Sequence, residues 1–185
     1  LEVCDAYHLG IEPRSDSGIG VGKGADWNLV PRVPTQIDLN NKTYTKIVSD
    51  FLKTKQFKKP EVKISQAVSI DLDGDGKNEV ILTATNQRET EGDGTGYSFV
   101  LLRKIVGKSA QNFLLAGDFY PNEIASVELN AFEVGAIADL NGDGKMEIVL
   151  NSFHPYYDGG GSEVFQITGI KAVTVKTLRT GCGFF

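Results

Sequence analysis

The stretch Asp71-Leu72-Asp73-Gly74-Asp75-Gly76-Lys77-Asn78-Glu79 carries acidic side chains at its first, third, fifth and ninth positions. It recurs, beginning at residue 139, as Asp139-Leu140-Asn141-Gly142-Asp143-Gly144-Lys145-Met146-Glu147. Carboxylates crowded into one short turn repel one another, and a hard cation that takes oxygen ligands relieves this repulsion. The duplicated turn therefore predicts two bound calcium ions, one in each copy.

The spacing within each turn assigns a role to each position. Alternate side chains converge on one point only if the backbone curls around it, and the glycine at position six permits that curl. Position seven contributes its carbonyl, and the glutamate at position nine closes the shell directly or through a water molecule. The expected ligands are Asp71, Asp73, Asp75, Lys77 and Glu79 in the first turn, and Asp139, Asn141, Asp143, Lys145 and Glu147 in the second. Because Asn141 replaces an aspartate, we expect tighter binding at the first turn.

Two other interpretations of the motif fit the sequence less well. An EF-hand needs an acidic residue at position twelve, where this chain has Leu82 and Leu150, so the turns are not EF-hands. Asp-Gly and Asn-Gly pairs also form plain hairpin turns, but such turns need no acid at positions five and nine. A full shell of protein ligands leaves no reactive water, so we expect a structural rather than a catalytic calcium ion.

The rest of the chain predicts a mainly β protein with one helix. Residues 43–57 carry apolar side chains at three- and four-residue spacing, which predicts an amphipathic helix that covers a sheet and is ended by Pro60. Beyond Pro60 the pattern has period two, with short runs rich in Val and Ile. It predicts two repeated four-stranded antiparallel sheets, with strands at 62–70, 79–85, 97–105, 112–119, 132–138, 147–153, 163–168 and 172–178.

The 185 residues have the usual size of a single domain. We divide this domain into an N-terminal loop-rich segment with the helix (1–60), a first repeat (61–120) and a second repeat (121–185). The order of these parts follows from the position of the two acidic turns.

The stretches 70–80 and 138–148 resemble FG-GAP or VCBS repeats, the calcium-loop blades of integrin-type β-propellers and of many bacterial surface proteins. The chain is also similar to small uncharacterised bacterial exported proteins with two such repeats. The resemblance implies propeller-blade-like sheets, calcium between the first two strands of each, and the same ten ligands. Closed propellers need about four to eight blades. Two sheets are therefore expected to cover their faces with each other, with the helix or with a second copy in a homodimer, and the N-terminal segment to pack across one side.

The net charge and the two cysteines limit the expected partners and the expected cellular compartment. The net charge of −5 and the pI of about 5.1 argue against nucleic-acid or anionic-membrane partners, and no apolar run is long enough to span a bilayer. A disulfide between Cys4 and Cys182 would close nearly the whole chain into one loop and would imply an oxidising compartment. We therefore expect a secreted, periplasmic or cell-surface protein, although two free thiols or a lipidated Cys4 are the alternatives.

A polar loop of the second repeat holds the candidate ligand-binding residues His154, Tyr156, Tyr157 and Asp158. Exposed aromatic rings there suit a glycan or a peptide, unless the tyrosines fold back onto the core. The chain has no Ser-His-Asp context, His-Glu-x-x-His motif or phosphate loop, so no catalytic residue is assigned. A calcium-binding adhesion-type module is the first hypothesis. A secreted glycan or peptide hydrolase using Asp93, Asp158 or Glu163 is the alternative, and a scaffold role in the envelope is the third.

Overall fold

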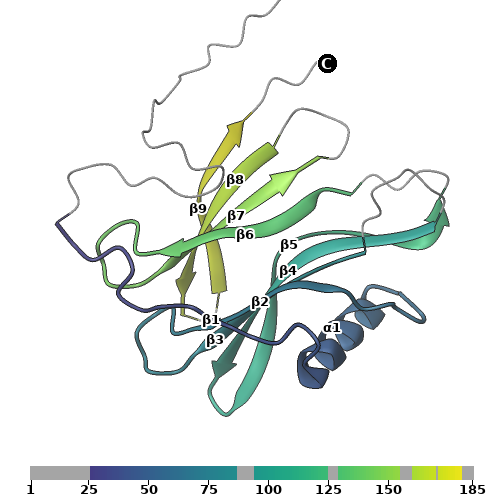
Figure 1. Ribbon diagram of the computed structural model, residues 1–185, viewed down its shortest axis with the longest axis horizontal. Coiled ribbons are helices and arrows are strands. Elements are labelled where there is room, and N and C mark those ends of the chain that lie inside the picture. The colour runs from purple at the N-terminus through teal and green to yellow at the C-terminus, as the bar shows by residue number, and fades with distance from the viewer. Residues whose placement is uncertain (1–25, 87–93, 125–128, 155–159, 170, 181–185) are drawn as a thin grey trace, which may run out of the picture.

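The computed structural model describes residues 26–86, 94–124, 129–154, 160–169 and 171–180. This described part of the chain is mainly β, with two antiparallel sheets and one helix (Figure 1). The first sheet has the order β1-β2-β3-β4-β5 and the second has the order β6-β7-β8-β9. The strands are β1 (Thr35–Gln36), β2 (Ile64–Ile70), β3 (Glu79–Thr85), β4 (Gly94–Val106), β5 (Ser109–Ile124), β6 (Ala131–Ala138), β7 (Glu147–Phe153), β8 (Gly160–Thr168) and β9 (Lys171–Thr180).

The first sheet differs from the expected four strands. The short strand β1 comes from the loop-rich N-terminal segment and pairs with β2, with Thr35 opposite Ser69 and Gln36 opposite Val68. It satisfies backbone groups that the outer edge of β2 would otherwise leave unpaired. The period-two pattern could not reveal this strand, because two exposed residues carry no alternation.

Helix α1 (Lys42–Thr54) begins at Asn41, whose side chain accepts a hydrogen bond from the Thr43 amide at 3.0 Å. Its apolar face covers the first sheet, as the spacing predicts, and Val48 and Leu52 are fully buried there. The helix therefore stabilises the sheet by removing one apolar face from water.

Pro60 does not end this helix, contrary to the prediction. The chain turns at Gln56, which has a left-handed φ of 72°. The Phe57 amide then donates to the Leu52 carbonyl at 3.2 Å, and the Gln56 amide donates to the Lys53 carbonyl at 3.0 Å. This is a Schellman cap, which closes the helix well before the proline.

Two clusters of buried apolar side chains hold the layers together. The first lies between α1 and the first sheet, where the Phe99 ring centroid lies 5.1 Å from that of Phe51 and 5.4 Å from that of Phe119. The second lies between the two sheets and joins residues such as Leu102 and Ile148. The described part of the chain thus forms three layers, helix, first sheet and second sheet (Figure 1).

The two repeats use the same sheet face for different neighbours. Val80 and Leu82 on β3 belong to the cluster that faces α1. Their counterparts on β7, Ile148 and Leu150, belong to the cluster that faces the first sheet. The sheets therefore stack in the same sense, one behind the other, and do not meet through equivalent faces.

In the part of the chain that the structure describes, no helix combines the length and apolar character needed to cross a bilayer.

Candidate metal centre

The first acidic turn is built around Asp71, at the end of β2. Its carboxylate accepts hydrogen bonds from the amides of Gly74 at 2.8 Å, Asp75 at 3.1 Å and Gly76 at 3.0 Å. This bonding requires the backbone to curl, and Gly74 and Gly76 have φ values of 78° and 82°. Glycine adopts such angles without the cost that a side chain would bring.

The second turn has the same backbone arrangement. Asp139 accepts from the amides of Gly142 at 2.7 Å and Gly144 at 2.9 Å, and these glycines have φ values of 78° and 81°. The glutamate at position nine also repeats its contact, because Glu79 accepts from the Leu72 amide at 2.9 Å and Glu147 from the Leu140 amide at 2.8 Å. The motif therefore specifies one turn conformation, which the chain uses twice.

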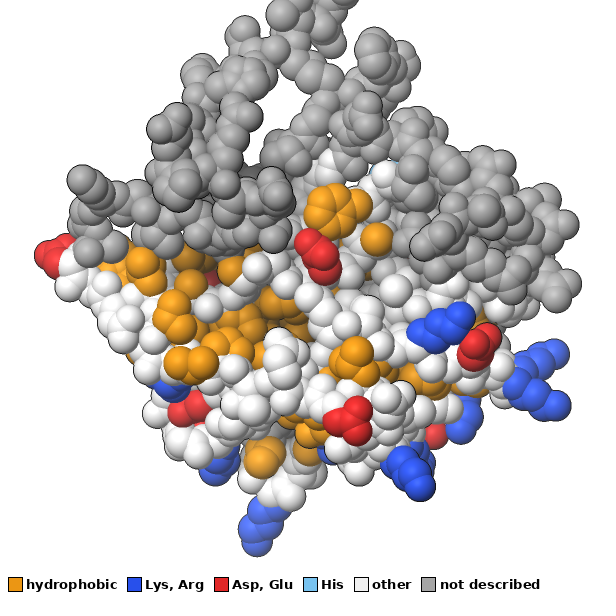
Figure 2. All heavy atoms as spheres, viewed as in Figure 1, with side chains coloured by type: hydrophobic (Ala, Val, Ile, Leu, Met, Phe, Trp, Pro, Cys, Tyr) orange, Lys and Arg blue, Asp and Glu red, His pale blue; other side chains and the backbone are white. Residues whose placement is uncertain are grey.

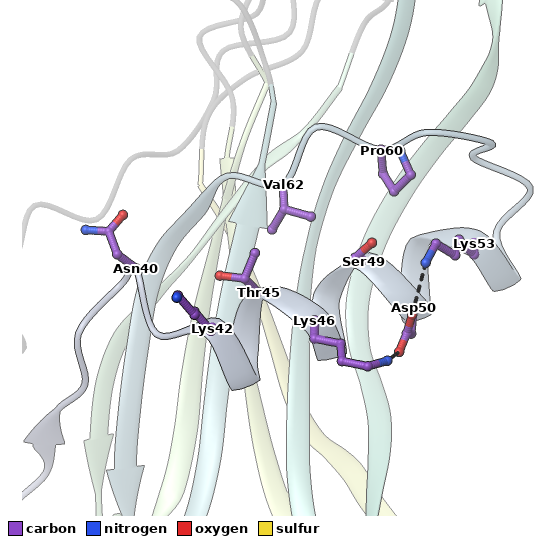
Figure 3. A pocket seen from close by; sticks show the side chains of 9 residues that line it. All are labelled: Asn40, Lys42, Thr45, Lys46, Ser49, Asp50, Lys53, Pro60 and Val62. Atoms are coloured by element: carbon purple, nitrogen blue, oxygen red, sulfur yellow. Dashed lines mark hydrogen bonds and ion pairs between the residues drawn. The ribbon is translucent and has the colours of Figure 1, made fainter.

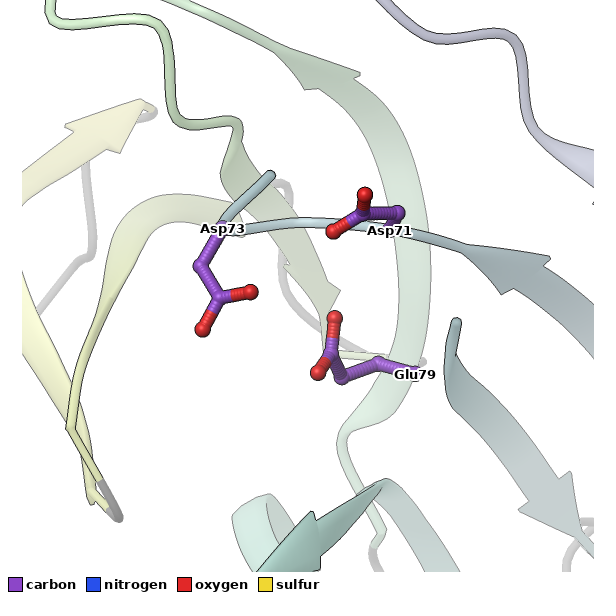
Figure 4. Close-up of side chains that lie close together, drawn as sticks. All are labelled: Asp71, Asp73 and Glu79. Atoms are coloured by element: carbon purple, nitrogen blue, oxygen red, sulfur yellow. The ribbon is translucent and has the colours of Figure 1, made fainter. Parts of the chain in front are cut away.

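Three of the four acids of the first turn converge. Asp71, Asp73 and Glu79 each place a carboxylate oxygen within 4.8 Å of the others, and Figure 4 shows the three groups turned toward a common space. Asp75 instead accepts from the Lys77 amide at 2.8 Å, and Asp143 accepts from the Lys145 amide at the same distance. Clusters of exposed acids often hold no ion, so the convergence needs a further observation to indicate a cation.

That observation is the side chain of Lys104, on β4. Its ammonium group donates to Asp73 Oδ2 and to Glu79 Oε1, at 2.7 Å in both cases, and Lys104 is only 7% exposed. Burial lowers the pKa of Lys104, but the hydrogen bonds and charges of Asp73 and Glu79 outweigh this effect and raise the pKa above its usual value. Burial likewise raises the pKa of Asp73, but the hydrogen bond and charge of the Lys104 ammonium outweigh burial. The pKa of Asp73 therefore lies below its usual value. One buried carboxylate oxygen, Asp73 Oδ1, has no hydrogen-bond partner.

The second turn holds its acids without such a counter-charge. Asp139 and Glu147 are 3% and 2% exposed, and among the side chains that the structure describes, no Lys or Arg forms an ion pair with them or with Asp143. Their partners are neutral amides. Asn141 Nδ2 donates to Glu147 Oε1 at 3.4 Å, and Gln166 Nε2 donates to Asp143 Oδ2 at 3.0 Å. Burial, followed by the charges of Asp143 and Asp139, raises the pKa of Glu147.

Arg32 joins the two turns to each other. Its Nε donates to the Asp71 carbonyl at 2.5 Å, and its Nη2 donates to the carbonyls of Leu72 at 3.2 Å and Gly144 at 2.7 Å. The Met146 amide also donates directly to the Leu72 carbonyl at 2.8 Å. The turns therefore lie side by side and share Arg32 as a hydrogen-bond donor.

Trp27 lies against the second turn. Its Nε1 donates to the Asp139 carbonyl at 2.8 Å, and its ring lies 3.0 Å from the place that a Cβ atom on Gly142 would occupy. The Asp139 amide donates to the Leu29 carbonyl at 2.8 Å. The segment from Trp27 to Arg32 thus packs across both turns, in agreement with the expected position of the N-terminal segment.

Four residues that matter here were not identified from the sequence. Lys104 gave one signal, a charge inside the predicted strand 97–105. Trp27, Arg32 and Gln166 gave none, because their roles depend on which segments the fold brings together.

The remaining candidates are mostly not described. Cys4, Cys182, Asp93, Tyr156, Tyr157 and Asp158 lie outside the described residues. His154 follows the end of β7 and is half-buried. Glu163 lies within β8 opposite Leu150 and is also half-buried. How the hydrolase candidates and the proposed stacking residues lie relative to one another is therefore outside what the described residues show.

A polar groove beside α1 is a second feature of the surface. It is lined by Asn40, Lys42, Thr45, Lys46, Ser49, Asp50, Lys53, Pro60 and Val62 (Figure 3). Asp50 pairs with Lys46 and Lys53, and the hydrogen bonds from these two lysines lower its pKa. Lys and Arg side chains gather on the side of the molecule where α1 lies (Figure 2). The groove is open and its acid already has cationic partners, so it does not indicate a particular ligand.

Comparison of the chain with protein-family models, with curated proteins and with solved structures finds no match. The function must therefore be argued from the acidic turns themselves.

Proposed function

We propose that this chain is a calcium-stabilised β module of a secreted or cell-surface protein, in which a calcium ion at the second turn holds two blade-like sheets in place. Asp139, Asn141, Asp143 and Glu147 would hold the ion with oxygen atoms, the donors that calcium prefers over softer metals. The ion would supply positive charge to the buried acids. Millimolar calcium, as found outside cells, suits a site of modest affinity.

One observation carries this proposal. The first turn, with the same backbone, holds a cation against its acids, namely the ammonium of Lys104 at 2.7 Å from two carboxylates. The carboxylates of this turn therefore bind a positively charged group. In the second turn, Glu147 is equally buried and meets only neutral donors among the described side chains. Isolated buried charge is costly, and a divalent ion would offset that cost.

Thermal unfolding with and without calcium tests the proposal. A ligand at 100 times its Kd stabilises a protein by about 2.7 kcal/mol. For a chain of this size, removing calcium with a chelator should therefore lower Tm by about 5 to 10 °C. The variant Asp143→Asn should lose most of this shift, because it removes a charge without removing the side chain.

The matched control is Glu133→Gln, which removes an exposed acid on β6 of the same sheet, away from the turn. It should keep the full calcium-dependent shift. Equal melting temperatures of the parent chain in calcium and in chelator would refute the proposal.

Recognition of a glycan or a protein remains the proposed role of the surface near His154. Phe153, at the end of β7, is 48% exposed and shortly precedes Tyr156 and Tyr157 in the sequence. Binding of the protein to a glycan or peptide array tests this role. Phe153→Ala should reduce the binding without changing Tm.

A further inference from the structure

The ammonium of Lys104 occupies the place in the first turn where calcium-ligating oxygens would converge. It approaches Asp73 and Glu79 at 2.7 Å and is almost fully buried. Lys104 continues the face of β4 that also carries Val100 and Leu102, both in the cluster between the sheets. The chain thus extends a charged side chain from an otherwise apolar face directly to the acids.

The remaining hydrogen bonds to carboxylates of the first turn come from neutral amides, as they do in the second turn, so the Lys104 ammonium is what distinguishes the two turns. Both carboxylate oxygens of Asp71 accept backbone amides, and Glu79 Oε2 accepts the Leu72 amide. Among the buried side-chain oxygens that the structure describes, Asp73 Oδ1 is the one without a hydrogen-bond partner. A divalent ion placed here would meet a cation within a few ångströms in a site with little water, where like charges repel strongly.

The second repeat offers a matched position. In the first sheet Val80 on β3 pairs with Arg103 on β4. Because the strands are antiparallel, the preceding residue Glu79 lies opposite the following residue Lys104. In the second sheet Ile148 pairs with Phe165, so Glu147 lies opposite Gln166. Gln166 indeed reaches the second turn and donates to Asp143 Oδ2 at 3.0 Å. The same place in the fold therefore holds a cation in one repeat and a neutral amide in the other.

We propose that Lys104 is a built-in cation that takes the place of the metal at the first turn, so that this protein binds one divalent ion, at the second turn, and not two. This inference rests on the proposed calcium site for the location of the single ion. The extra carboxylate of the first turn then belongs to an internal ion pair and does not raise metal affinity. Gln166 is the residue that gives the second turn a neutral donor where the first turn has a cation.

Exchanging the two residues tests the inference. Calcium titration calorimetry on the chelator-treated full chain should give one ion for the parent protein. Lys104→Gln, which copies the second repeat, should give two ions. Gln166→Lys, which copies the first repeat, should give none. Because Lys104→Gln could impair folding, circular dichroism checks each variant, and Gln166→Lys tests the same rule while leaving Lys104 in place.

Terbium luminescence reports an ion close to Trp27, independently of the calcium titration. Tb³⁺ takes the oxygen ligands of calcium, and Trp27, the single tryptophan of the chain, lies against Gly142 and can sensitise an ion in the second turn. The parent protein and Lys104→Gln should both show the sensitised signal, and Gln166→Lys should lose it.

The outcomes separate this inference from the proposed function. Two ions in the parent protein would overturn the role of Lys104 and leave calcium binding intact. No ion in the parent protein but one in Lys104→Gln would support Lys104 as the replacement and refute the calcium site at the second turn. No ion in any variant would overturn both.

Discussion

The two acidic turns share one backbone and differ in how their charge is balanced. Each has an aspartate that accepts the amides of left-handed glycines, and each has a buried glutamate at position nine. The first turn meets the Lys104 ammonium, and the second meets the amides of Asn141 and Gln166. The comparison teaches that the motif specifies the shape of the turn, whereas a strand distant in sequence determines whether the turn needs an external cation.

The largest contrast is expected at position nine, in protein stripped of calcium. Glu79→Gln removes one partner of a buried ion pair and should destabilise the protein by about 3 kcal/mol. Glu147→Gln removes a buried charge that has no cationic partner among the described side chains, and should stabilise the protein by about 1 kcal/mol. Urea unfolding at neutral pH measures both changes. Two changes of the same sign would contradict the difference in charge balance.

The pH dependence sharpens this contrast. The pKa of Glu147 is raised in the folded state, so between its ordinary value of 4.5 and the raised value the folded state binds more protons than the unfolded state. The stability of the calcium-free parent protein should therefore fall as the pH rises through this range. The advantage of Glu147→Gln should be present at neutral pH and disappear below about pH 4.5. An advantage that persists below that pH would indicate a packing effect and not a charge effect.

Much of the fold followed from periodicity. Strands 79–85 and 147–153 have the predicted bounds, and the helix covers the first sheet as expected. The signal was strong there because apolar runs follow directly on the acidic turns. The end of α1 was not predictable in the same way. A glycine often marks a left-handed residue at the end of a helix, whereas a glutamine such as Gln56 does not indicate this conformation.

The candidate site was predictable in its turns but not in its surroundings. The positions of Asp71 and Asp139 and the curl at the glycine of position six followed from spacing alone, whereas the left-handed glycines Gly74 and Gly142 were not predicted. The contact between Lys104 and Glu79 depends on the β3–β4 register, and that of Gln166 with Asp143 on the β7–β8 register. Neither register can be read from one motif. An estimate of relative affinity from carboxylate counts alone therefore omits the residue that supplies the opposite charge.

Arg32 tests whether the turns act together or separately. Arg32→Ala removes three hydrogen bonds from a charged donor to carbonyls of both turns and should destabilise the protein by about 2 kcal/mol. Arg103→Ala, which removes an exposed contact to Asn112, should change stability by less than about 0.5 kcal/mol. If the turns are coupled, Arg32→Ala should also weaken calcium binding at the second turn, as measured by titration. Unchanged affinity would mean that the turns share a scaffold but act independently.

The smallest expected effect distinguishes the two glycines of the second turn. An alanine at Gly142 or at Gly144 meets the same left-handed strain, about 1 kcal/mol. A Cβ at Gly142 would also lie 3.0 Å from the Trp27 ring, whereas one at Gly144 has no neighbour within 4 Å. Gly142→Ala should therefore cost about 1 kcal/mol more than Gly144→Ala and should shift the tryptophan emission.

The first turn provides the control for this last prediction. At Gly74 the nearest atom to an added Cβ is Arg32 Nη1 at 3.3 Å, the end of a flexible side chain that can move aside, and at Gly76 nothing lies within 4 Å. Gly74→Ala and Gly76→Ala should thus differ by less than the pair in the second turn. An equal difference in both turns would show that the glycine dihedral angles, and not the Trp27 contact, set the cost.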